Sequence, residues 1–167
     1  MRHIISIELQ NEAGALTRVA GLFSNRGYNI ESLHVAPTDD QTISRLTLVT
    51  SGSDDVVDQI CSQLLKLVDV VALLDMTRSG HIERELLLLK MTRPRANDEV
   101  FDELLREEGA RVLDDRLDSY TIELTASGPV IDTFLSNVKR HGRIVTVVRS
   151  GIMALSRGAP LVGPQDG

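Results

Sequence analysis

The order in which two hydrophobic periodicities follow one another constrains this chain more than any other feature. Residues 3–9 alternate apolar and polar side chains, which predicts a half-buried strand, whereas apolar residues recur at helical spacing over residues 14–26. The rest of the first half continues with strands at 29–36, 42–50 and 70–76, and with a helix that follows Gly52-Ser53-Asp54. The predicted order is therefore strand, helix, strand, strand, helix, strand.

The same order recurs in the second half, with strands and helices at 85–91, 98–107, 111–115, 120–125, 130–139 and 144–148. Ile5 aligns with Leu87 and Gly27 aligns with Gly109, and the same number of residues separates the two members of each pair. This separation becomes smaller for positions after the hairpin. The fold class expected from this pattern is α+β, with two ferredoxin-like βαββαβ units. We expect the first domain at 1–77, a linker at 78–82, the second domain at 83–158 and a disordered tail at 159–167.

Composition excludes several classes of function. The net charge of −6 argues against a general nucleic-acid binder, and 3% aromatic residues leave little surface for stacking on bases. The longest apolar runs, Val70–Leu74 and Leu86–Leu89, are far shorter than a membrane span. The single cysteine, Cys61, allows no intrachain disulfide, and the N-terminus lacks the layout of a signal peptide. We therefore expect a cytoplasmic protein.

No set of residues indicates a catalytic or metal centre. The sequence has no glycine-rich phosphate loop and no paired metal-ligand spacing, and its four histidines lie far apart along the chain. Cys61 lies on the apolar face of the second predicted helix, which is typical of a small buried residue rather than a nucleophile. We expect no catalytic residue, metal or cofactor on this chain.

The most informative segment is Asn11–Leu16, where the first strand passes into the first helix. A helix start has free N–H groups and a partial positive charge, and Gly14 lets another molecule approach those amides closely. A carboxylate is the type of group that such a site receives. The alternative is that Asn11 caps the helix and Gly14 only permits a tight turn, and the local sequence by itself favours this alternative.

Longer motifs resemble a known family. The segments NEAGALTRVAGLFSNRGYNIESLHVAPTDD and SRLTLVT resemble the ACT domain, an amino-acid-sensing βαββαβ module. Within them, GLFSNRGYNIESL and APTDD are similar to the small regulatory subunits of acetolactate (acetohydroxyacid) synthase. The similarity continues through KLVDV at 66–70, ERE at 83–85 and RSGIMALSRG at 149–158.

This resemblance implies a regulatory role. Members of the family bind a large catalytic subunit that carries thiamine diphosphate, Mg²⁺ and FAD, raise its activity and make it sensitive to valine or another branched-chain amino acid. The effector is held between the ACT domains of a homodimer. By position, the helix-end amides would come from one protomer, and residues of the second strand would face them from the other. The residues matched in this way are Asn11, Gly14, Ala15 and Leu16 on the first protomer, and Asn29, Ile30 and Ala36 on the second.

Three points stay open or differ from the family pattern. Residues 92–96 replace the glycine-bearing loop in the second half, so we expect no effector site there. Asn29 is as readily explained as a turn residue after Gly27. The alternative function is a free-standing ACT sensor that regulates another enzyme or transcription, although no basic recognition helix is evident.

Overall fold

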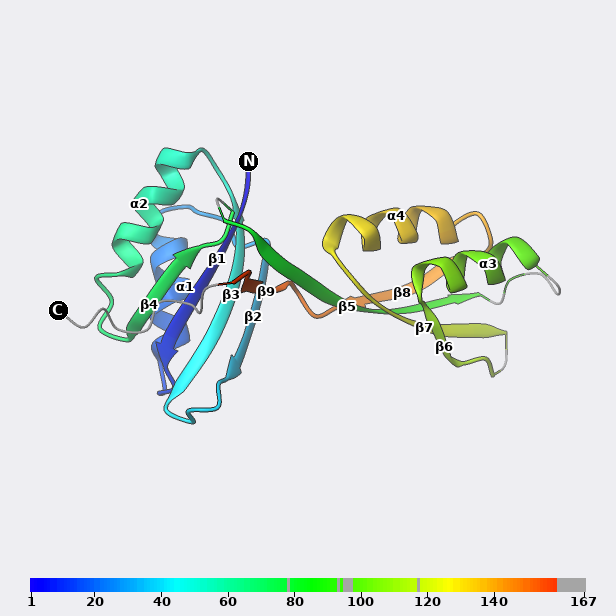
Figure 1. Cartoon of the computed structure of the whole chain (residues 1–167), viewed down its shortest axis with the longest axis horizontal. Coiled ribbons are helices and arrows are strands. Elements are labelled where there is room, and N and C mark those ends of the chain that lie inside the picture. The colour runs from blue at the N-terminus through cyan, green and yellow to red at the C-terminus, as the bar shows by residue number, and fades with distance from the viewer. Residues whose placement is uncertain (78, 93, 95–97, 117, 159–167) are drawn as a thin grey trace. The chain divides into compact units, whose positions relative to one another are not determined.

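Each half of the chain forms the predicted βαββαβ unit, so the expected fold is confirmed (Figure 1). The computed structural model describes residues 1–77, 79–92, 94, 98–116 and 118–158. The elements of the first half are β1 (Arg2–Gln10), α1 (Ala15–Asn25), β2 (Ser32–Pro37), β3 (Ile43–Ser51), α2 (Asp54–Leu64) and β4 (Val70–Asp75). Those of the second half are β5 (His81–Thr92), α3 (Glu99–Glu108), β6 (Arg111–Asp114), β7 (Ser119–Ala126), α4 (Gly128–Val138), β8 (Ile144–Arg149) and β9 (Met153–Ser156).

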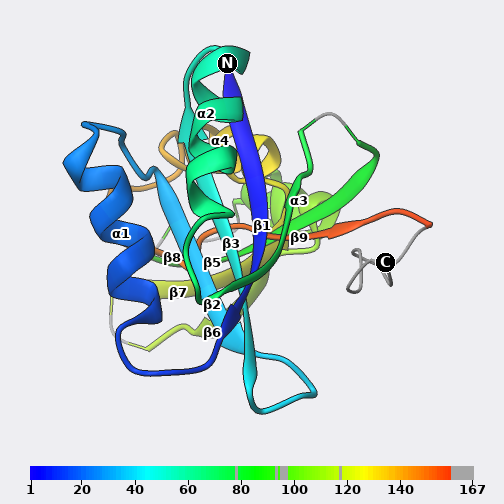
Figure 2. The ribbon, with the colours of Figure 1, turned by 90° about the vertical axis from the view of Figure 1, so that its left-hand side faces the viewer.

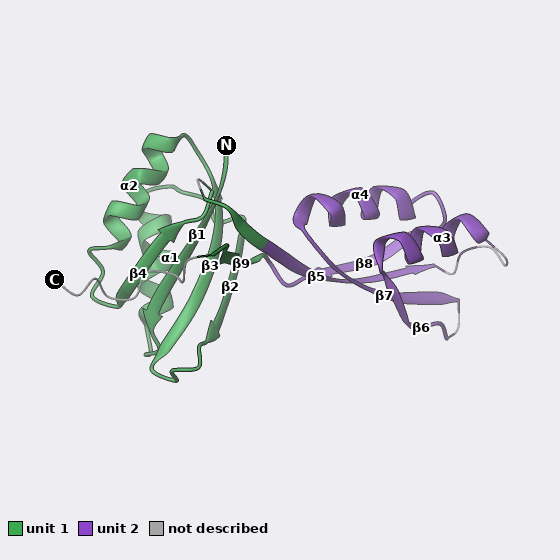
Figure 3. Cartoon of the chain, viewed as in Figure 1, with its two compact units in different colours: residues 1–82, 152–167 green, residues 83–151 purple. Residues whose placement is uncertain are grey.

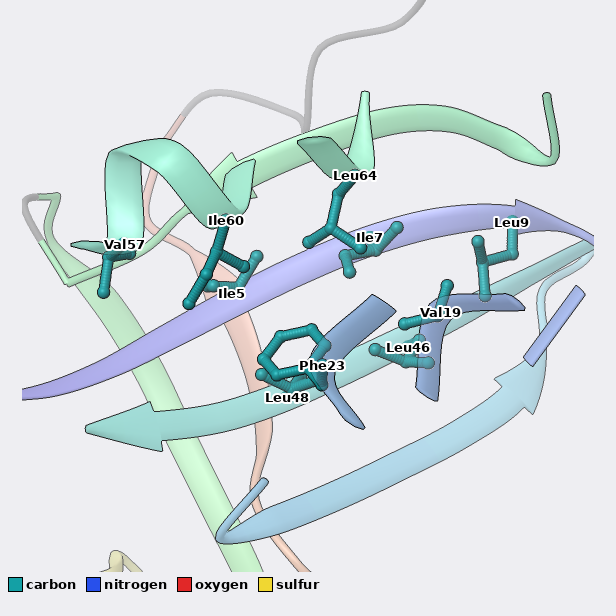
Figure 4. Close-up of a cluster of buried hydrophobic side chains, with 10 residues drawn as sticks. All are labelled: Ile5, Ile7, Leu9, Val19, Phe23, Leu46, Leu48, Val57, Ile60 and Leu64. Carbon is teal, nitrogen blue, oxygen red and sulfur yellow. The ribbon is translucent and has the colours of Figure 1, made fainter. Parts of the chain in front are cut away.

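The first sheet has the antiparallel order β2-β3-β1-β4, and both helices lie on one of its faces (Figure 2). Alternation along the strands places one apolar row beneath those helices. That row meets the apolar sides of α1 and α2 in a single buried cluster (Figure 4). The cluster contains Ile5, Ile7, Leu9, Val19, Phe23, Leu46, Leu48, Val57, Ile60 and Leu64.

The second sheet repeats this arrangement with the order β6-β7-β5-β8 and its own core. Phe101 of α3 and Phe134 of α4 are fully buried against the apolar rows of β5 and β7. The two halves therefore have separate cores, as expected from a duplicated unit.

Strand β9 is a feature that periodicity did not predict. It pairs with β5, and the segment that contains it covers part of the face of the first sheet opposite the helices. There Ile152 and Ala154 are buried with Ile4, Val49 and Met76. A four-residue strand has too few positions to show a period, and its partners lie far away in the sequence.

The chain divides into two compact units: Met1–Ile82 together with the segment from Ile152, and Glu83–Gly151 (Figure 3). The predicted boundaries differ from these in two places. The expected linker 78–82 overlaps β5, which begins at His81. The expected second domain 83–158 includes β9, although Ala154 of this strand and the preceding Ile152 lie in a core cluster of the first unit. The proposed disordered tail, 159–167, lies outside the described residues.

Candidate effector site

The start of α1 leaves backbone amides open to a ligand. Gly14 occupies the N-cap position with φ of 92°, a left-handed conformation that favours glycine, and no side chain caps the helix. The N–H of Ala15 bonds weakly to the Glu12 carbonyl at 3.3 Å. Within the described residues, the N–H groups of Leu16 and Thr17 have no acceptor. These two donors and the helix dipole make this end of α1 suited to an anion.

Asn11 anchors the loop before the helix rather than capping it. Its side-chain Nδ2 donates to the Gln41 carbonyl at 2.8 Å, and its backbone N–H donates to Thr42 at 2.7 Å. The alternative in which Asn11 caps the helix is therefore wrong, because the cap position falls on Gly14. The side-chain oxygen of Asn11 has no donor within the described part of the chain, so it can accept a hydrogen bond from an ammonium group.

Arg18 is a site residue that the sequence analysis missed. A Cβ atom added to Gly14 would lie 2.8 Å from Nη1 of Arg18, so the guanidinium lies directly over the glycine. Asp69 holds the other two nitrogens, with Nε–Oδ2 at 2.5 Å and Nη2–Oδ1 at 2.6 Å. This bidentate pair fixes the fork and leaves Nη1 without a partner among the described residues. The spacing of four residues between Gly14 and Arg18, one turn of helix, is a signal that could have revealed it.

The same pair sets the ionisation of both groups. The hydrogen bonds from Arg18 lower the pKa of Asp69 below its ordinary value, although burial of the carboxyl opposes this effect. Conversely, the hydrogen bonds to Asp69 raise the pKa of Arg18. Both groups are therefore charged at neutral pH, and the guanidinium beside Gly14 is a permanent cation.

The other predicted site residues fall into two groups. Ala15 is buried in the unit, whereas the side chain of Leu16 is 39% exposed beside the open amides and offers an aliphatic surface. Asn29 and Ile30, expected at the start of the second strand, in fact precede β2, which begins at Ser32. The Asn29 carbonyl accepts a hydrogen bond from the Thr50 hydroxyl, and Ile30 packs against the core.

One chain does not bring these two groups together. Asn11 lies beside Thr42 at one end of β3, whereas Asn29 lies beside Thr50 at the other end. Eight residues of extended strand separate these ends by roughly 25 Å. Ala36 pairs with Arg45 and lines a shallow cavity of about 300 Å³ with Ala154, on the face of the sheet opposite α1.

The rest of the described chain offers no competing centre. No group of three potential metal-ligating side chains is found in the described ranges, and no described helix is long and apolar enough to cross a membrane. His3 is fully buried near Asp54 and Asp75, at 3.5 and 3.7 Å. The expectation about the second-half loop at 92–96 falls mainly on residues 93, 95 and 96, which lie outside the described ranges.

Comparison with known proteins identifies the family. Residues 5–72 match the model described as the AHAS small subunit-like ACT domain, and residues 84–158 match the model for the small subunit of acetolactate synthase. The acetolactate synthase isozyme 3 small subunit of Escherichia coli is 45% identical over 161 residues, which cover 95% of this chain and 97% of that protein. The chain belongs to the family of acetolactate synthase small subunits.

Other acetolactate synthase small subunits agree. The one from Haemophilus influenzae is 42% identical, with 95% of this chain and 97% of that protein covered. The crystal structure of the small subunit from Thermotoga maritima superposes with a TM-score of 0.84 at 28% identity, over 95% of this chain and 99% of that one. These matches confirm the family resemblance, and they span both units rather than the ACT domain alone.

Proposed function

We propose that this chain is the regulatory subunit of an acetolactate synthase. It binds the catalytic large subunit, raises the activity of that subunit and makes it subject to feedback inhibition by valine or another branched-chain amino acid. The chemistry belongs to the large subunit, which carries thiamine diphosphate, Mg²⁺ and FAD. The observation that supports this proposal best is the open start of α1 beneath the Arg18 guanidinium.

Three parts of an α-amino acid have matching groups at this site. The carboxylate is received by the N–H groups of Leu16 and Thr17 and by Nη1 of Arg18, which are charge-assisted donors in one place. The ammonium is received by the free side-chain oxygen of Asn11 and by carbonyl groups. The exposed side chain of Leu16 forms one aliphatic wall for a branched side chain.

The position of Asn29 supports a site shared between two chains. Within one chain Asn29 and Ile30 lie at the end of β3 remote from Gly14, and Ala36 lies on the opposite face of the sheet. Asn29 and Ile30 can contact the same effector as Gly14 only if a second protomer supplies them. We therefore place the effector at a seam between two ACT domains of a homodimer.

A shared site couples the ligand to the geometry of the dimer. If both halves of the pocket meet in only one arrangement of the two protomers, effector binding favours that arrangement. Couplings of this kind amount to about 1–3 kcal/mol, or roughly 5- to 150-fold in an equilibrium. This is sufficient for feedback control when the favoured arrangement supports the large subunit less well.

Reconstitution tests the proposal. The purified chain is mixed with an acetolactate synthase large subunit, and acetolactate formation is measured with and without valine. We expect activation by the chain, inhibition by valine only when the chain is present, and no acetolactate from the chain alone. Binding of valine without any effect on the large subunit would instead support the alternative of a free-standing amino-acid sensor.

A further inference from the structure

The first unit contains a completely buried histidine whose ring makes no hydrogen bond. His3 shares the helix-facing side of β1 with Ile5 and Ile7, and its side chain has no exposed surface. Neither of its ring nitrogens has a hydrogen-bond partner among the described residues. Burying a polar group without a partner is costly, so packing alone does not account for this ring.

Two carboxylates lie beside the two nitrogens of the ring. Oδ1 of Asp54, in the first turn of α2, lies 3.5 Å from Nε2, and Oδ2 of Asp75, at the end of β4, lies 3.7 Å from Nδ1. Both distances exceed the range of about 2.7–3.2 Å that is typical of an N–H···O hydrogen bond. Oδ1 of Asp75 accepts a hydrogen bond from the backbone N–H of Thr77 at 2.9 Å, but Oδ2 is buried without a partner among the described residues. A buried acceptor therefore faces a buried ring nitrogen, and neither has another partner there.

Only the protonated ring matches both neighbours. Neutral imidazole has one N–H group and one bare nitrogen, so it donates to one carboxylate and turns a lone pair towards the other. Imidazolium has two N–H groups and can donate to Asp54 and Asp75 at once, with charge assistance. Histidine is also the side chain whose charge ordinarily changes between about pH 5 and 8. The site therefore has a charged form with two hydrogen bonds and a neutral form with at most one.

The other groups around the ring leave this choice to the two carboxylates. On β3, the residue directly opposite His3 is Thr50, which is uncharged. The N-terminal ammonium of Met1 donates to the Gly52 carbonyl at 3.1 Å. The positive end of the α2 dipole opposes a cation here, and the acidic first turn of that helix, which includes Asp55, offsets this effect.

We propose that His3 is a pH-dependent switch in the first unit. Proton uptake brings Asp54 and Asp75 within hydrogen-bond distance of the two ring nitrogens, and so joins the start of α2 and the end of β4 to β1. Loss of the proton breaks at least one of these connections. The stabilisation is therefore present at about pH 6 and is lost as the pH rises to about 8.

The switch lies next to the second group of candidate effector residues. Thr50, the partner of His3 on β3, donates its hydroxyl hydrogen to the Asn29 carbonyl at 2.7 Å. At the same end of β3, the Val49 carbonyl accepts a hydrogen bond from the N–H of Glu31 at 2.8 Å. Proton uptake therefore stabilises the end of the strand that holds Asn29. The consequence for feedback control rests on the proposed function, whereas the protonation of His3 does not.

Nuclear magnetic resonance of the full chain tests the switch without a large subunit or valine. The ring nitrogens are followed in protein with isotope-labelled histidine from about pH 5 to 8, and His3→Gln identifies the signals of His3. Asp54→Asn and Asp75→Asn each remove one charge and keep the shape of the side chain. Asp55→Asn is the matched control, because it removes a charge from an exposed position in the same turn of α2.

We expect both nitrogens of His3 to be protonated at about pH 6, and one of them to have lost its proton at about pH 8. The ratio of charged to neutral ring at neutral pH should fall about tenfold in Asp75→Asn, because a hydrogen bond to a charged group is lost, and should stay unchanged in Asp55→Asn. A ring that keeps one protonation state throughout this range would overturn the proposal. So would an equal fall in Asp55→Asn, because the general charge of the surface would then control the ring.

Hydrogen exchange measures the effect of the proton on the fold. At about pH 6 the amide of Glu31 should exchange several-fold faster in His3→Gln than in the wild type, and this difference should disappear at about pH 8. Each comparison is made at one pH, so the intrinsic pH dependence of exchange cancels. A ratio of rates that is the same at both pH values would contradict the switch, because the proton would then change nothing in the fold.

Discussion

Replacing Gly14 by aspartate should abolish valine sensitivity while leaving activation of the large subunit intact. The new carboxylate would lie at the open amides of α1 and under Arg18, in the place proposed for the carboxylate of the effector. Two like charges about 4 Å apart at an effective dielectric constant near 20 repel by about 4 kcal/mol. Since about 1.4 kcal/mol corresponds to a factor of ten, the affinity for valine should fall by roughly 500- to 1000-fold.

The same substitution has a cost in stability that must be separated from its effect on binding. A residue with a Cβ atom at φ of 92° is strained by about 1–2 kcal/mol, and the Cβ atom would force Arg18 to move. A negative charge at a helix start stabilises the fold by about 0.3–1 kcal/mol, which offsets part of that strain. Gly14→Asn is the matched control, because it has the same shape and the same strain without the charge.

Titration calorimetry with valine and acetolactate assays with the large subunit should be run on both variants. We expect Gly14→Asp to bind no measurable valine and Gly14→Asn to retain binding that is at most tenfold weaker. Equal losses in the two variants would show that strain, not charge, controls the site. Normal inhibition of Gly14→Asp would show that the effector binds elsewhere.

Three further predictions concern stability. Asp69→Asn should lower stability at neutral pH, because the lowered pKa of Asp69 makes its charged form a stabilising one. This contribution is present above the ordinary pKa of 3.8 and is lost as pH falls through the lower folded-state value, so the urea unfolding of variant and wild type should converge in acid. Arg149→Met leaves Glu85, which is 3% exposed, as an unpaired buried charge, and should destabilise the second unit by about 3–5 kcal/mol in urea unfolding. Phe134→Ala should cost the second unit about 3–5 kcal/mol, with hydrogen exchange in the first unit unchanged.

Each of these predictions has a contrary result. A stability gap for Asp69→Asn that persists unchanged at low pH would mean that the hydrogen bonds, not the ionisation, matter. Adding Glu85→Gln to Arg149→Met should recover most of the loss, and no recovery would refute the buried-charge argument. Faster exchange in the core of the first unit of Phe134→Ala would contradict two independent cores.

Local periodicity predicted the order of the βαββαβ elements, since strands and helices here each bury one face. Boundaries were less predictable. Apolar residues recur at helical spacing from Val57 to Val68, but α2 ends at Leu64 and Val68 is 82% exposed. The helical spacing of apolar residues continues beyond the end of α2, and only the turn before β4 shows where the helix ends. Strand β9 was not predicted because its contacts are made with strands formed much earlier in the chain.

The candidate site was predicted in part. Gly14 was singled out because a glycine at a helix start has a distinct physical meaning, and the structure places it at the N-cap. Arg18 was missed because its role depends on Asp69, which is 51 residues away and turns an ordinary helix-surface cation into a fixed one. Which protomer supplies Asn29 stays a prediction.

The segment that contains β9 packs against the first unit, so the second unit is an insertion in a domain that resumes after it. A stop codon placed after β4 would therefore not yield an intact ACT domain. It would remove Ile152 and Ala154 and expose one side of Ile4 and Val49 to solvent. A shortened protein that keeps its native interior should instead excise residues 83–151 and splice Ile82 to Ile152.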